Sequence, residues 1–173
     1  MPPIVNRLAR LLPHVCLLLA ILVPATAIAI MALIPVETFL ASLKLSASPL
    51  PEFGWEQRSI AALILLLPSG CLSYALMKAR SSLRRFNRGD YFSASAIRDI
   101  RGFGAGIFWS GMVKFAVWPL VTLVVTGMYS ARSLLMGLGT STLVMLTIGG
   151  ILWQIASMMQ RAAELAEENR QFV

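Results

Sequence analysis

The chain has 173 residues and a net charge of +7, from 15 basic and 8 acidic side chains. Hydrophobic residues make up 57% of it and charged residues only 13%, against about 25% in a typical soluble domain. This composition excludes a disordered chain and argues against a water-soluble globule, while two cysteines and one histidine exclude a disulfide framework and a Cys/His zinc site.

Four apolar runs, taken in chain order, are long enough to cross a bilayer. A helix rises about 1.5 Å per residue, and the hydrocarbon core of a bilayer is about 30 Å thick. Residues 11–36, 59–77 and 133–159 carry no formal charge, and residues 103–130 carry only Lys114. We therefore expect one all-α domain, an integral membrane four-helix bundle with an up-down-up-down order.

The basic residues predict which side of the membrane each connection faces. If both termini and residues 78–101 share one side, that side carries 11 lysines and arginines and the other side carries 3. The side richer in lysine and arginine is normally the cytoplasm. We expect both termini in the cytoplasm, and we expect anionic lipid rather than nucleic acid to face the basic residues.

The basic cytoplasmic loop, residues 78–101, is predicted to be largely ordered. The second span can continue as a helix through Phe86, and Asn87-Arg88-Gly89-Asp90 is a stop-and-turn sequence. Ser93 or Ser95 can then cap the helix that leads into the third span.

The C-terminal tail, residues 160–173, continues the fourth helix with one apolar and one charged face. Its three acidic side chains suggest that the tail docks against the basic loop. The loop and the tail would then form one cytoplasmic interaction face. The alternative is a solvated, charged tail that does not dock. Surface ion pairs contribute about 0–1 kcal/mol each, so docking would orient the tail more than stabilise it. The residues of this candidate face are Arg84, Arg85, Arg88, Arg98, Glu164, Glu167 and Glu168.

Lys114 is a candidate polar site within the membrane. A lysine at mid-bilayer costs about 2.5–3.5 kcal/mol on insertion scales, so it normally faces a bundle interior or water. In one interpretation Lys114 lines a polar cavity and binds an anion or a lipid phosphate. In the other, residues 94–111 lie partly at the cytoplasmic interface, the span starts near Met112, and the lysine extends to the headgroups.

Small residues mark one face of the third predicted helix. Gly102, Gly106 and Ser110 recur every four residues, a spacing that allows two membrane helices to approach closely. The same pattern is compatible with a homo-oligomer, although it is common in membrane helices generally.

Combinations of residues typical of an active site are missing from the sequence. The spans hold no carboxylate pair, nucleophile system or metal-ligand cluster, so we expect no enzyme and no cofactor. The favoured hypothesis is a non-enzymatic interaction or regulatory protein that presents its cytoplasmic loop and tail to a partner or to anionic lipid. The alternative is a small transporter or pore-forming oligomer that uses Lys114 and the prolines within its spans, Pro24, Pro68 and Pro119.

Two cytoplasmic motifs resemble a known family. The turn runs Phe86-Asn-Arg-Gly89-Asp-Tyr-Phe92-Ser93, and the tail contains Glu164-x-x-Glu167-Glu168-Asn169. Together they are similar to a family of small bacterial four-span inner-membrane proteins catalogued as a domain of unknown function, over a stretch from about residue 60 to the end. The resemblance implies a location in the bacterial inner membrane. It also implies a cytoplasmic regulator as a possible partner, because some members are encoded beside small helix-turn-helix regulators. Lys114 has no counterpart in the family pattern.

Overall fold

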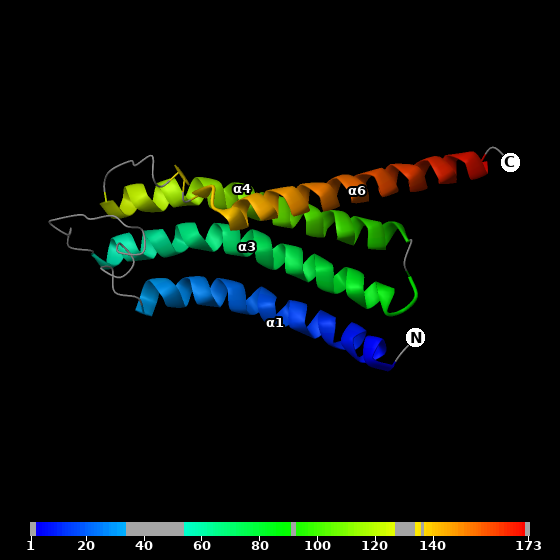
Figure 1. The fold of residues 1–173 in the computed structure, drawn as a ribbon, viewed down its shortest axis with the longest axis horizontal. Helices are drawn as coiled ribbons and strands as arrows, with labels where there is room; N and C mark the ends of the chain where they lie inside the picture. The colour runs from blue at the N-terminus through cyan, green and yellow to red at the C-terminus, as the bar shows by residue number, and fades with distance from the viewer. Residues whose placement is uncertain (1–2, 34–53, 91–92, 127–133, 136, 172–173) are drawn as a thin grey trace.

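The computed structural model describes residues 3–33, 54–90, 93–126, 134–135 and 137–171. This part of the chain forms four long α-helices and contains no strand (Figure 1). The helices are α1 (Pro3–Leu33), α3 (Trp55–Phe86), α4 (Ala94–Thr126) and α6 (Thr140–Gln171).

Each helix contains a stretch that is long and apolar enough to cross a membrane, so the prediction of four spans is confirmed. These stretches are Leu11–Ile30, Ser59–Phe86, Ala94–Val124 and Thr140–Leu165. The ends of three predicted spans, residues 34–36, 127–130 and 133, lie outside the described part of the chain. Much of the predicted loop 78–101 is helical, because α3 continues to Phe86 and α4 begins at Ala94.

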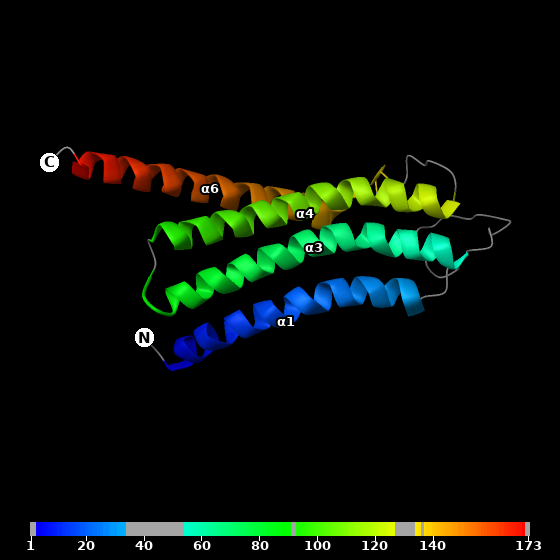
Figure 2. The same ribbon diagram turned by 180° about the vertical axis from the view of Figure 1, so that it is seen from behind.

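The helices alternate in direction, which places both chain termini and the turn between α3 and α4 at one end of the molecule (Figures 1 and 2). We call this the terminal end, and it comprises the start of α1, residues 84–96 and the last part of α6. The main contacts join helices that follow one another in the chain: α1 with α3, α3 with α4, and α4 with α6. The bundle is therefore an open row, with α1 and α6 at its edges.

Small side chains lie between the helices and large apolar side chains lie on the outside. Ala61, Ala75 and Ala156 are at most 1% exposed. Leu63 and Ile151, by contrast, expose 67% and 55% of their surface. This arrangement suits a lipid solvent, in which helices associate through close packing rather than through burial of large apolar groups.

The small-residue face of α4 packs against α3. A Cβ atom added to Gly106 would lie 2.8 Å from the Cβ of Ala75, and one added to Gly102 would lie 3.2 Å from Cγ of Lys78. The Ser110 hydroxyl donates a hydrogen bond of 2.9 Å to the carbonyl oxygen of Pro68. The structure thus uses Gly102, Gly106 and Ser110 within one chain, and a homo-oligomer stays a prediction.

Another set of glycines brings α4 against α6. A Cβ atom at Gly149 would lie 2.5 Å from the backbone nitrogen of Phe108 and 3.0 Å from the carbonyl oxygen of Gly104. A Cβ atom at Gly104 would lie 2.5 Å from the backbone nitrogen of Trp153. The backbones of the two helices therefore touch at this crossing.

Helix α6 is offset along the row. It begins beside the middle of α4 and continues past the start of α4 at the terminal end (Figures 1 and 2). The predicted continuation of the fourth helix into the tail is confirmed, since α6 extends to Gln171. Residues 161–165 of this part are exposed.

We predict that Gly149→Ala lowers the free energy of unfolding by about 1–3 kcal/mol, because the added methyl group would force α4 and α6 apart. Gly70→Ala is the matched control, because nothing lies within 4 Å of the methyl group added on that side of α3. Thermal unfolding of the purified protein in detergent measures both variants. Equal melting temperatures would show that the α4–α6 contact is not tight.

Candidate functional site

A buried carboxylate joins α3 to α4 near the terminal end. Asp99, in the second turn of α4, is only 6% exposed. One of its oxygens accepts hydrogen bonds from Ser81 Oγ at 2.6 Å and Arg85 Nε at 3.1 Å. The other accepts one from Lys78 Nζ at 3.3 Å. We call Lys78, Ser81, Arg85 and Asp99 the Asp99 clamp.

The geometry of the clamp follows from helical periodicity. Lys78, Ser81 and Arg85 are three and four residues apart, so they share one face of α3. A buried charge is costly unless it is paired and hydrogen-bonded, and Asp99 meets both conditions. The two cations keep part of their side-chain surface in contact with the surroundings, 32% for Lys78 and 39% for Arg85.

The start of α4 is tied to the same network. Arg85 Nη1 donates to Ser95 Oγ at 3.0 Å. The Ser93 hydroxyl accepts the backbone N–H of Ala96 at 3.2 Å and donates to Asp90 Oδ2 at 2.9 Å. Of the two predicted capping residues, Ser93 therefore caps the helix, and Ser95 binds an arginine.

A tight turn joins the two helices of the clamp. The backbone N–H groups of Gly89 and Asp90 donate to the carbonyl oxygens of Phe86 and Arg85 at 2.9 and 3.1 Å. Gly89 has a φ of +85°, which a residue with a side chain adopts only with strain. The predicted stop-and-turn sequence is confirmed, and it fixes the distance between α3 and α4.

Asp99 was not among the predicted site residues, although the sequence holds a signal for it. It is the only acidic residue between Asp90 and Glu164. It also lies three residues before Gly102, so it extends the small-residue face of α4 by one turn. An acidic residue on a close helix contact, in a segment rich in arginine, predicts a buried ion pair.

The predicted interaction face is only partly brought together. Arg84, Arg88 and Arg98 are exposed, whereas Arg85 binds Asp99 instead of a tail glutamate. Glu164 accepts a hydrogen bond of 2.9 Å from Gln160 of its own helix. The side chains of Glu167 and Glu168 lie outside the described part of the structure.

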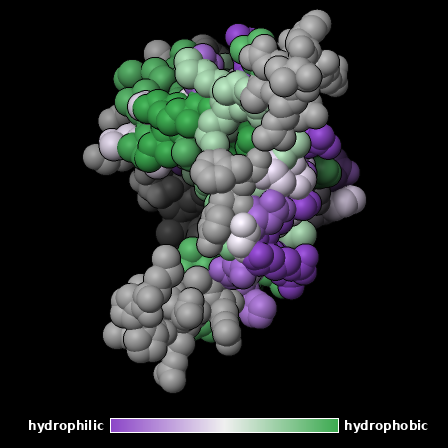
Figure 3. Space-filling model, turned by 90° about the vertical axis from the view of Figure 1, so that its right-hand side faces the viewer, coloured by the Kyte–Doolittle hydropathy of each residue, from purple (hydrophilic) through white to green (hydrophobic). Residues whose placement is uncertain are grey.

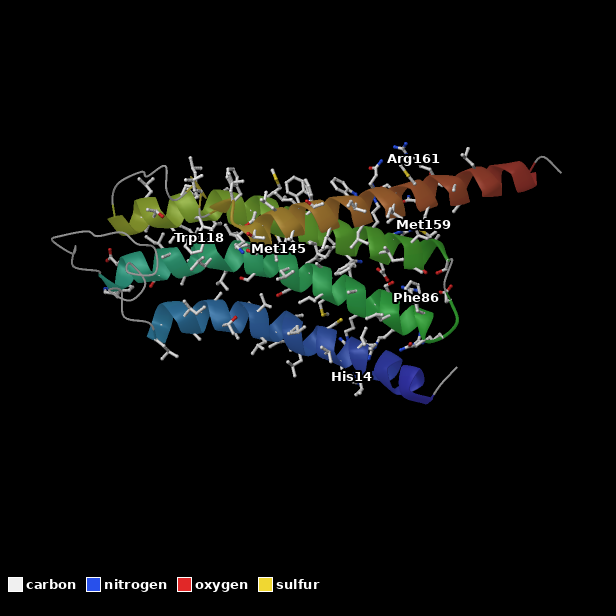
Figure 4. The ribbon with its side chains drawn as sticks, in the orientation of Figure 1. His14, Phe86, Trp118, Met145, Met159 and Arg161 are labelled. Atoms are coloured by element: carbon white, nitrogen blue, oxygen red, sulfur yellow. The ribbon has the colours of Figure 1, made fainter. Side chains whose placement is uncertain are left out.

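Packing explains why the described tail does not reach these arginines of α3. Helix α6 packs on α4, and Figure 4 shows α4 lying between Phe86 at the end of α3 and Arg161 on α6. Near the terminal end α6 is joined to α4 by Arg101, whose Nη1 donates to Gln160 Oε1 at 2.9 Å. Among the residues with described side chains, no salt bridge joins α6 to the predicted arginines.

Three other arginines, two of α3 and one in the turn after it, line a groove that opens towards the terminal end. Arg80, Arg84 and Arg88 follow one another at intervals of four residues, and the groove between them has a volume of about 300 Å³. Ser81 and Arg85 of the clamp form part of its wall. We call this the arginine groove. Figure 3, viewed from the terminal end, shows hydrophilic residues gathered along one side of this end, beside a hydrophobic area.

A second groove of about 370 Å³ lies between α4 and α6. Its charged and polar side chains include Arg101, Gln160 and Glu164, which are already joined to one another by hydrogen bonds. This groove therefore has fewer free donors to offer to a ligand than the arginine groove.

Lys114 lies in the middle part of α4. Its amine donates a hydrogen bond of 2.8 Å to Ser141 Oγ in the first turn of α6. One of the three ammonium donors therefore has a partner within the protein. Both interpretations of Lys114, the polar cavity and the headgroup contact, stay predictions.

The terminal end presents hydrogen-bond donors that could bind an anion. Guanidinium groups and a hydroxyl donate hydrogen bonds and do not exchange protons near neutral pH. Among the described residues, no group of three or more His, Cys, Asp or Glu side chains could hold a metal ion.

We predict that Asp99→Asn lowers the free energy of unfolding by about 1–3 kcal/mol. The asparagine amide has only one acceptor oxygen, and its NH₂ group would face the donors of Lys78, Ser81 and Arg85, so some of these donors would lose their acceptor. Glu164→Gln is the matched control, since it removes the same charge from an exposed carboxylate with one hydrogen bond. Thermal unfolding in detergent is the measurement, and we expect the control to stay within about 0.5 kcal/mol of the unsubstituted protein. A stable Asp99→Asn variant would refute the clamp.

Comparison with known proteins identifies a family. No curated protein and no solved structure matches the chain. The family model that matches is described as "Protein of unknown function (DUF2975)", and the match covers residues 5–172. It therefore includes α1 as well as the Asp99 clamp and the arginine groove, a longer stretch than the two motifs of the sequence indicate. The chain belongs to the DUF2975 family of proteins of unknown function.

Proposed function

We propose that this chain is a non-enzymatic interaction or regulatory protein, which binds a partner or anionic lipid at the terminal end. The observation that carries the proposal is the distribution of charge around the clamp. Asp99 binds Lys78 and Arg85, while Arg84 and Arg88 remain exposed beside it. A rigid hairpin thus presents cations that the described part of the chain does not neutralise.

The kind of residues at this end favours binding over catalysis. Arginine stays protonated at any physiological pH, so it cannot act as a general acid or base there. Its guanidinium group is instead suited to binding phosphate and carboxylate groups with two parallel hydrogen bonds. A surface of this kind recognises an anionic partner or an anionic membrane surface.

The proposed location is the cytoplasmic face of a bacterial inner membrane. Both terminal segments and residues 78–101 together carry 11 of the 15 lysines and arginines, and the positive-inside rule supports a cytoplasmic position for them. The bacterial inner membrane is what the resemblance of the two motifs implies.

A transporter or pore-forming oligomer is the second candidate, and its support is weaker. The four described helices form an open row, which by itself encloses no lumen, so a pore would need several copies. Lys114, on which this candidate depends, already binds Ser141.

We predict that reporter domains fused to the two termini of the full chain both report a cytoplasmic location. The terminal segments and residues 78–101 hold 11 of the 15 basic residues, and translocating them would oppose the usual charge bias. The measurement is the activity of a reporter that works only in the cytoplasm and of one that works only outside it. Activity of the outside reporter at either terminus would contradict the proposed orientation.

A photo-crosslinking residue in place of Arg84 tests the interaction itself. In native membranes we expect a discrete protein adduct, or a lipid adduct enriched in anionic lipids, because Arg84 is exposed in the arginine groove. The same residue in place of Leu63, which is 67% exposed on the apolar surface, is the control for bulk lipid. If position 84 gave only the adducts seen at position 63, the proposed function would be wrong.

A further inference from the structure

The arginine groove brings three positive charges together around one hollow. Arg80 and Arg84 lie one turn apart on one face of α3, and together with Arg88 in the turn that follows they line a groove of about 300 Å³. Like charges four residues apart repel each other and destabilise a helix. An anion held between them would relieve this repulsion.

One of the arginines that line this groove has a buried hydrogen-bond donor without a partner among the described residues. The Nε atom of Arg80 is buried and has no hydrogen-bond acceptor. A buried donor without an acceptor costs about 1–3 kcal/mol, and such donors are rare in native proteins. An oxygen atom of a ligand in the groove would supply an acceptor if the Arg80 side chain, which lines the groove, turned this nitrogen towards it.

The position of the groove along α3 indicates a lipid. At one end it is lined by Met77, an apolar side chain that is 46% exposed within the candidate membrane stretch Ser59–Phe86. At the other end lies Arg88, in the turn that follows the helix. The helix rises about 14 Å from Met77 to its last residue, Phe86, so the groove passes from an apolar to a cationic environment.

We propose that the arginine groove binds an anionic phospholipid, with the phosphate group between Arg80, Arg84 and Arg88 and an acyl chain along Met77. Arginine binds phosphate oxygens with a planar pair of donors, and basic pockets on membrane helices bind anionic headgroups. The Asp99 clamp supports the site, because Ser81 and Arg85 line the groove while they bind Asp99. The inference rests on the proposed function and names the ligand class of the same surface.

Lipid titration of the purified full chain tests the proposal. Native mass spectrometry in a neutral detergent would count bound phosphatidylglycerol and phosphatidylcholine with the same acyl chains. We expect the anionic lipid to bind more tightly. We also expect Arg84→Gln/Arg88→Gln to weaken its binding at least about tenfold, since charge-assisted hydrogen bonds are lost.

The matched control is Arg98→Gln/Arg161→Gln, which removes two positive charges from exposed positions of α4 and α6. We expect this double variant to bind phosphatidylglycerol like the unsubstituted protein. If both double variants bound phosphatidylglycerol equally weakly, the loss would be explained by net charge alone, and the proposed site would be wrong. Equal binding of the two lipids by the unsubstituted protein would overturn it as well.

A further pair of substitutions guards against misfolding. Arg84→Lys/Arg88→Lys keeps the charges but removes the paired donors, so we expect weaker binding than in the unsubstituted protein and an unchanged melting temperature. Full binding by this variant would contradict a phosphate held by guanidinium groups.

Two outcomes separate the possible occupants of the groove. If inorganic phosphate at the same concentration displaced the bound phosphatidylglycerol, the site would be one for a soluble anion, and the lipid assignment would be wrong. If no anionic lipid bound but the crosslinker at position 84 captured a discrete protein, the lipid site would fall and the proposed function would stand. Failure of both experiments would refute both.

Discussion

The close approach of α4 to both of its neighbours is the constraint on which the rest of the structure depends. Gly106 lies against Ala75 of α3, and Gly104 lies against the backbone at Trp153 of α6. Lipid supplies no hydrophobic driving force between helices, so packing at this distance and a few polar contacts must hold the row together. Because α3 and α4 are this close, the short side chain of Asp99 reaches across to three donors.

The clamp in turn determines which charges are free. One carboxylate takes up Lys78 and Arg85, and these two cations tie α3 to the start of α4. Arg80, Arg84 and Arg88 form no salt bridge with the described side chains and line a groove instead. The proposed binding surface therefore depends on the contact that holds the hairpin together, since residues 77–88 line the groove and also supply the donors of the clamp.

Features set by local sequence could be predicted, and features set by packing could not. Span length, the turn at residues 87–90 and the Ser93 cap depend on neighbouring residues, and the structure has them as expected. The order of the helices in space depends on which helix each glycine packs against, and the spacing of glycines in the sequence does not indicate the partner helix. Charge alone predicted that the tail glutamates lie near Arg84, Arg85, Arg88 or Arg98, with a solvated tail as the alternative, and it did not indicate that Arg85 binds Asp99.

The offset of α6 gives the molecule a protruding rod. From Arg161 to Gln171 the helix continues for ten residues, a rise of about 15 Å. Electrostatic fields in physiological salt decay over about 8 Å, so the tip of such a rod would scarcely sense the guanidinium groups at its base. The arginine groove and the protruding end of α6 are therefore two separate surfaces, and a charge bound at one would have little electrostatic effect on the other.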